Sequence, residues 1–145
     1  PLMPGAGFQL GPKLTPEQTA DVQFGFGLAK QVSRLEIGQT VVVKGGTVLA
    51  VEGFEGTDQC LARGGQLAGT EGGAVAVKVA REGHDMRFDI PCMGLKTLET
   101  CGASGIQVLA LEAGKSLILD EDEVRNFAER NQLSVVTVSS NASPK

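Results

Sequence analysis

Residues 41–52, V-V-V-K-G-G-T-V-L-A-V-E, decide the class of fold that the sequence predicts. Two runs rich in β-branched residues, 41–43 and 47–52, flank the turn sequence K-G-G, which is typical of a β-hairpin. Strand-like runs and helical patterns alternate along the rest of the chain and indicate an α/β domain. Because a tight turn joins antiparallel strands, we expect a mixed β-sheet with flanking helices, containing one β-hairpin.

A helix is predicted before the hairpin. Thr15 can cap it, Pro16 suits its first position, and Gln18 can complete a capping box. Gly25 and Gly27 each weaken such a helix by about 1 kcal/mol relative to Ala, so we expect them to permit close approach of another backbone. Apolar residues at helical spacing predict its buried face, namely Ala20, Phe24, Leu28, Val32 and Leu35.

The sequence after the hairpin predicts three further helices and three further strands. Thr57 or Asp58 is expected to cap the first of these helices, and Asp120 the last. The predicted strand 74–80 alternates, with valines on one face and alanines with Lys78 on the other. The elements are helices at 59–67, 94–101 and 121–132 and strands at 74–80, 106–112 and 133–138.

Residues 15–138 are therefore predicted to form a single α/β domain. Residues 1–14 hold three prolines and three glycines without an apolar period, and we interpret them as a linker from an absent N-terminal domain. Residues 139–145 are predicted to be a disordered tail.

Composition restricts the class of protein. The chain has 145 residues, a net charge of −4 and neither Trp nor Tyr, which argues against a nucleic-acid-binding protein. Cys60, Cys92 and Cys101 are odd in number and lack C-x-x-C spacing. We therefore expect reduced, cytoplasmic thiols that serve packing and bind no metal. No apolar run approaches the length of a transmembrane helix.

A charged stretch, residues 81–91 (R-E-G-H-D-M-R-F-D-I-P), follows a predicted buried strand. In an extended segment, Asp85, Arg87 and Asp89 point to one face. That arrangement suits a divalent metal held by carboxylates beside an arginine that clamps phosphate. A turn with solvated surface ion pairs fits the same spacing. The single histidine, His84, fits either a general base or an exposed turn residue.

A second candidate is the sequence E-G-T-D at residues 55–58, where a strand leads into a helix. Gly56 lets a ligand approach the backbone, and the free amides at a helix N-terminus favour phosphate. Asp58 can hold a divalent metal, although Thr57 and Asp58 also fit simple helix caps. Lys78 fits either a partner for phosphate or an exposed lysine that protects an edge strand from aggregation.

Four stretches together resemble a known family. They are S-R-L-E-I-G-Q-T-V-V-V-K at 33–44, V-L-A-V-E-G-F-E-G-T-D at 48–58, V-K-V-A with D-M-R-F-D-I-P at 77–80 and 85–91, and V-L-A-L-E-A-G-K at 108–115. They resemble the C-terminal domain of the UDP-2,3-diacylglucosamine pyrophosphatases of lipid A biosynthesis, of the type found in α-proteobacteria and relatives. The resemblance covers nearly all of residues 15–138.

The resemblance implies that this domain is catalytic and that an absent N-terminal half helps to enclose the substrate. It implies hydrolysis of the pyrophosphate bond of UDP-2,3-diacylglucosamine, dependent on Mg²⁺ or another divalent cation. The products would be UMP and 2,3-diacylglucosamine 1-phosphate (lipid X). Such an enzyme would be bacterial and cytoplasmic, with room for peripheral contact with the inner membrane.

By motif position, the resemblance places the essential catalytic aspartate at Asp89. A carboxylate-held Mg²⁺ needs acidic ligands, and we assign Asp58 and Asp89 to the metal. The sequence departs from the family at Arg81, where Lys is expected, and at His84, where Gln is expected, and these departures bear on substrate detail. The residues assigned to substrate binding are Gly56, Thr57, Lys78 and Arg87.

Two other classes of function fit the same sequence. The domain could be a non-catalytic binding module for a nucleotide-linked glycolipid or another phospho-ligand. It could also be a dimerising scaffold in which the strand at 74–80 extends a sheet across two chains, and a homodimer is compatible with the enzyme as well. Measurements of the oligomeric state and of the activity of the intact two-domain protein separate these alternatives.

Overall fold

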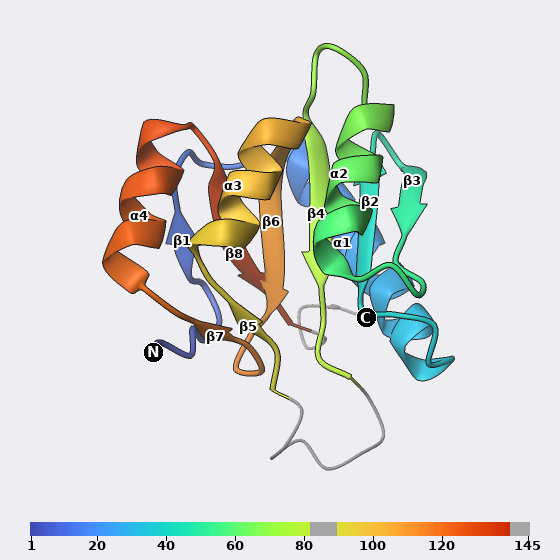
Figure 1. The fold of residues 1–145 in the computed structure, drawn as a ribbon, viewed down its shortest axis with the longest axis horizontal. Coiled ribbons are helices and arrows are strands. Elements are labelled where there is room, and N and C mark those ends of the chain that lie inside the picture. The colour runs from blue at the N-terminus through green and yellow to red at the C-terminus, as the bar shows by residue number, and fades with distance from the viewer. Residues whose placement is uncertain (82–89, 140–145) are drawn as a thin grey trace.

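The computed structural model describes residues 1–81 and 90–139, which form an α/β domain around a mixed six-stranded sheet (Figure 1). The strand order is β1-β8-β6-β4-β2-β3, and β3, β4, β6 and β8 run in one direction while β1 and β2 run in the other. The strands are β1 (Gln9–Leu10), β2 (Thr40–Lys44), β3 (Thr47–Val51), β4 (Ala74–Lys78), β6 (Ile106–Glu112) and β8 (Ser134–Val138). The predicted fold class and hairpin, β2–β3, are confirmed.

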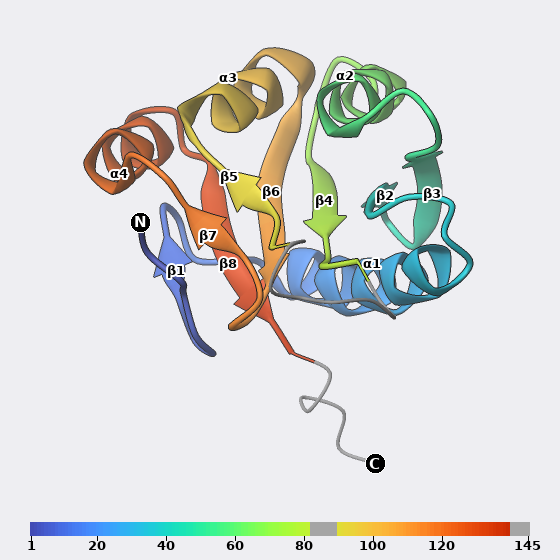
Figure 2. The ribbon, with the colours of Figure 1, turned by 60° about the horizontal axis from the view of Figure 1, so that its bottom comes forward.

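Helices cover both faces of the sheet (Figure 2). Helix α1 (Pro16–Arg34) lies on one face, and α2 (Thr57–Leu67), α3 (Leu95–Ser104) and α4 (Glu121–Arg130) lie on the other. A small parallel pair, β5 (Cys92–Met93) and β7 (Leu117–Ile118), lies beside the main sheet. Within 1–81 and 90–139, every helix is too short or too polar to cross a membrane.

Strand β4 separates two apolar cores. Val75 and Val77 belong to the core under α1, whereas Ala74 and Ala76 belong to the core under α2, α3 and α4. This alternation is the one predicted from the sequence. Because β4 is paired to β2 on one side and to β6 on the other, the edge-strand interpretation of Lys78 is wrong. The same pairing rules out β4 as a strand that extends the sheet into a second chain.

The buried face of α1 agrees only in part with the predicted one, since Leu28 and Val32 pack against the core but Ala20 is exposed. The capping box of Thr15 and Gln18 is present, but Phe24 and Leu35 are exposed. The carboxylate of Asp21 accepts hydrogen bonds from the amides of Gly45 and Gly46 and so ties the face of α1 that carries Asp21 to the hairpin turn. The residues of α1 that are buried are Asp21, Val22, Gly25, Phe26, Ala29 and Ser33.

The N-cap of α2 and the role of the N-terminal stretch also differ from expectation. The N-cap of α2 is Gly56, and neither Thr57 nor Asp58 caps it with a side chain. Asp120 occupies the N-cap position of α4, as predicted, but its side chain makes no capping hydrogen bond. The stretch 1–14, interpreted as a linker, contributes β1 to the sheet, and Leu10 is buried in the core.

The two glycines of α1 provide a matched test of this packing. A Cβ atom at Gly25 would lie 2.7 Å from Cγ2 of Val77 in β4, whereas one at Gly27 would meet no atom within 4 Å. We expect Gly25→Ala to lower the free energy of unfolding by about 1–3 kcal/mol through overpacking. Gly27→Ala should raise it by about 0.5–1 kcal/mol. Urea denaturation measures both, and equal shifts would contradict the contact between α1 and β4.

Candidate functional site

The carboxyl ends of four strands meet at one edge of the sheet, where the arrowheads of β4, β6 and β8 point in Figure 1. Ligands of open α/β sheets bind outside the carboxyl ends of the strands. At this edge β3 leads into α2 through residues 52–56, β4 ends at Lys78, and β6 ends at Glu112. The predicted sites at 55–58 and Lys78, far apart in the sequence, therefore lie on the same edge.

A hydrogen bond joins the two predicted sites directly. The ammonium Nζ of Lys78 donates to Oγ1 of Thr57 over 3.0 Å, at the first residue of α2. Oγ1 of Thr57 also lies 3.4 Å from Oγ1 of Thr40, a fully buried hydroxyl that sequence analysis missed. Among the described residues this is the hydrogen bond that Lys78 makes, and an ammonium has three donors. Two N–H donors of Lys78 are thus available to a ligand.

The environment of Lys78 favours an anionic partner. Burial lowers the pKa of Lys78 below its ordinary value, and the negative charges of Glu52 and Asp58 oppose that shift. Removing water from a charge strengthens its interaction with an opposite charge nearby. A phosphate placed against Lys78 would therefore be attracted more strongly than one on the open surface.

The N-terminus of α2 adds backbone donors to Lys78. Gly56 has φ of 94°, a conformation that glycine adopts without strain. Within residues 1–81 and 90–139 no side chain caps α2, so its first amides remain available to a ligand. Helices α3 and α4 also lack a side-chain cap, so the uncapped end alone does not single out this helix. The lysine beside it does.

The loop before α2 is fixed by an ion pair. Glu55 Oε1 accepts from the amide of Gly53 over 3.1 Å, and Oε2 accepts from Nε of Arg63 over 3.0 Å and also from NH2 of Arg63. NH2 of Arg63 donates to the carbonyl of Val51 over 3.0 Å. The hydrogen bond from Arg63 is the main cause that lowers the pKa of Glu55.

A second polar cluster fixes the chain beyond Lys78. Glu112 is 3% exposed, and its carboxylate accepts from Nζ of Lys30 over 2.8 Å and from the amide of Ala80 over 3.0 Å. Lys115 lies 3.7 Å from the same carboxylate. No motif in the sequence marks this cluster, and its one signal is an acidic residue at the end of a buried strand. The cluster anchors Ala80, two residues beyond the end of β4.

Several predicted site residues lie outside the described part of the chain. These are Arg87 and Asp89, together with His84 and Asp85. Asp58, the other predicted metal ligand, is in the first turn of α2. In residues 1–81 and 90–139, no three His, Cys, Asp or Glu side chains cluster closely enough to hold a metal.

Comparisons with known proteins agree with the resemblance seen in the sequence. The profile of a family described as "LpxI C-terminal domain" matches residues 5–136. The chain is 33% identical over 135 residues to a protein of Caulobacter vibrioides (strain ATCC 19089 / CIP 103742 / CB 15) named UDP-2,3-diacylglucosamine pyrophosphatase LpxI. The match covers 89% of this chain and 48% of that protein. The chain thus spans about half the length of this curated relative.

The three cysteines should differ sharply in reactivity. Cys60 and Cys101 are buried, and burial raises the pKa of each thiol to about 12, whereas Cys92 is exposed. Because the thiolate is the reactive form, we expect one thiol per native chain to react rapidly with DTNB, and three after unfolding. Mass spectrometry of the labelled protein should place the first label on Cys92. Rapid reaction of two or three native thiols would contradict the packing of α2 and α3.

Proposed function

Since this chain belongs to the LpxI C-terminal domain family, we propose that it is the catalytic domain of a UDP-2,3-diacylglucosamine pyrophosphatase. The reaction would add water to the phosphorus nearer the sugar and release UMP and 2,3-diacylglucosamine 1-phosphate. The observation in this chain that carries the proposal is the hydrogen bond of 3.0 Å between Lys78 and Thr57. It brings a partly desolvated cation to the amide end of α2, a combination that suits a diphosphate.

In this proposal, Lys78 and the first amides of α2 bind phosphate oxygens. The remaining two N–H donors of Lys78 would donate to oxygens of the diphosphate, while Thr57 holds the ammonium in place. Hydrolysis of a diphosphate requires its negative charge to be neutralised so that water can approach phosphorus. Arg87 is proposed to bind a further phosphate oxygen.

Mg²⁺ fits the proposed donor set. Phosphate-processing sites commonly hold Mg²⁺ through one or two carboxylates together with oxygens of the substrate. Asp58 lies close enough to Lys78 for its charge to influence that group, and we propose Asp58 and Asp89 as the protein ligands. When bound, the ion would supply charge neutralisation at the phosphates. Asp89 is also proposed to orient the attacking water.

The assignment of Asp89 has a direct test. In the intact two-domain protein, we expect Asp89→Ala to lower kcat for UMP release by about 10³-fold or more, because loss of a group that positions metal or water removes such a factor. UMP is measured by chromatography with UDP-2,3-diacylglucosamine and Mg²⁺. Asp122→Ala, at an exposed acid of α4, serves as the control. Undiminished turnover in Asp89→Ala would refute the site assignment.

The same experiment separates the enzyme from the binding module. Intact wild-type protein that binds UDP-2,3-diacylglucosamine but releases no UMP would favour a non-catalytic module for a nucleotide-linked glycolipid. Release of UMP that stops on addition of EDTA and returns with Mg²⁺ supports the enzyme.

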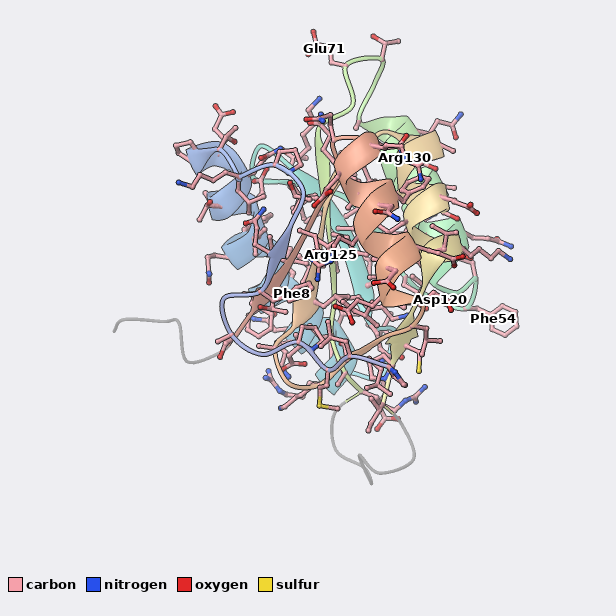
Figure 3. The ribbon with its side chains drawn as sticks, turned by 90° about the vertical axis from the view of Figure 1, so that its left-hand side faces the viewer. Phe8, Phe54, Glu71, Asp120, Arg125 and Arg130 are labelled. Carbon is pink, nitrogen blue, oxygen red and sulfur yellow. The ribbon has the colours of Figure 1, made fainter. Side chains whose placement is uncertain are left out.

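Apolar side chains at this edge suit the lipid part of the proposed substrate. Phe54 is fully exposed and points away from the domain in Figure 3. Ile37, half exposed, lines a small hollow together with Glu52, Gly53 and Arg81. Exposed apolar surface rimmed by polar residues can mark a ligand-binding groove. We propose that Phe54 and Ile37 contact acyl chains.

Removing Phe54 should therefore affect the lipid substrate selectively. We expect Phe54→Ala to raise KM for UDP-2,3-diacylglucosamine about 3- to 30-fold, in line with the free energy of burying part of a phenyl ring. Turnover of an analogue without acyl chains should stay unchanged. Phe24→Ala is the matched control, since Phe24 is also exposed but lies near the hairpin turn. Equal effects on both substrates would contradict an acyl contact.

A further inference from the structure

We infer that Glu55 and Arg63 are positioning residues, which fix Gly56 and the N-terminus of α2 relative to Lys78. The inference rests on the proposed function of that site. It also divides the E-G-T-D sequence into two parts. Glu55 holds the loop, whereas Gly56, Thr57 and Asp58 face the ligand.

The contacts of Arg63 tie three segments together. From the second turn of α2, its guanidinium donates to the last residue of β3, Val51, and to the loop residue Glu55. Glu55 in turn accepts from the amide of Gly53. A planar guanidinium with donors in a fixed fork defines the relative orientation of its acceptors, which a lysine would not do. Arg63 and Glu55 therefore fix the end of β3, the loop and α2 relative to one another.

Both carboxylate oxygens of Glu55 take part in these contacts. Oε1 is bound to the amide of Gly53 and Oε2 to Arg63. A carboxylate engaged in this way is not available as a metal ligand without breaking the loop. The acidic ligands proposed for this site are thus Asp58 and Asp89, and Glu55 acts through Gly56, the next residue.

A displacement of Glu55 or Arg63 would move the residues that contact Lys78. Gly56 connects Glu55 to Thr57, and Thr57 is the partner of Lys78. Displacement of a positioning group by about 1 Å can lower turnover by about 10²-fold. The side chains of Arg63 and Glu55 are 46% and 24% exposed, and exposed ion pairs contribute little to stability. Removing the pair should therefore affect turnover far more than folding.

The experiment uses Glu55→Gln, Arg63→Gln, Arg63→Lys and the double variant of Glu55→Gln with Arg63→Gln in the intact two-domain protein. The expected result is a 10- to 100-fold fall in kcat for UMP release in each single variant, with a smaller change in KM. The double variant should lose no more than either single variant, because the two residues act as one unit. Arg63→Lys keeps the charge but not the fork, so it should resemble Arg63→Gln.

The matched control is the pair Glu121 and Arg125 on α4, an exposed ion pair of 3.1 Å; Arg125 is labelled in Figure 3. Glu121→Gln and Arg125→Gln should leave kcat at the wild-type value. Turnover of the Glu55 and Arg63 variants at the control level would overturn the inference. So would a wild-type value for Arg63→Lys, which would indicate a role of charge alone. Losses that multiply in the double variant would also overturn it, because the two residues would then act independently.

A second measurement does not depend on activity. Hydrogen–deuterium exchange of the amides from Gly53 to Cys60 should be faster in Glu55→Gln and Arg63→Gln than in the wild type, with α4 unchanged. If wild-type protein releases no UMP, the proposed function fails, but faster exchange at these amides still supports the positioning role. Unchanged exchange would refute it, and a thermal midpoint lowered by more than about 5 °C would reassign the pair to general stability.

Discussion

The placement of β4 in the middle of the sheet is the constraint on which the other features depend. Its backbone is paired on both sides and its side chains are covered on both faces, so residues 74–77 must be small or apolar. The first position of β4 that can carry a charge is Lys78, at its carboxyl end. The fold thus delivers a cation to the one edge where α2 also presents free amides.

The segments around Lys78 are held by polar contacts that act over long sequence distances. Thr57 accepts from Lys78 and itself contacts Thr40, and Glu112 accepts from the amide of Ala80. None of these contacts lies within one element, because each links a strand end to a helix or to another strand. Their combined effect is an edge whose backbone is fixed before any ligand arrives, and such preorganisation is what electrostatic stabilisation of a phosphate requires.

The sequence predicted features whose cause is local. The K-G-G turn, the capping box at Thr15 and the alternation of valine and alanine in β4 each depend on neighbouring residues. The buried face of α1 was predicted only in part, because it also contains Asp21, whose carboxylate binds a turn 24 residues away. The predicted cap of α2 was wrong because Gly56, with φ of 94°, occupies the N-cap position one residue before Thr57. The contacts of Thr40, Arg63 and Glu112 leave no periodic pattern in the sequence, so they could not be predicted from it. The roles of Arg87 and Asp89 stay predictions.

The pairing of β1 with β8 places Gln9 opposite Val136, so the two ends of the domain close the same side of the sheet. Strand β8 consists largely of valine, and a bare strand of this composition would offer its hydrogen-bonding groups to other chains. The residue at which a recombinant protein starts therefore affects its tendency to associate. A shortened protein that starts after residue 11 would keep nearly all of the core yet expose β8, and its first defect would be self-association in solution.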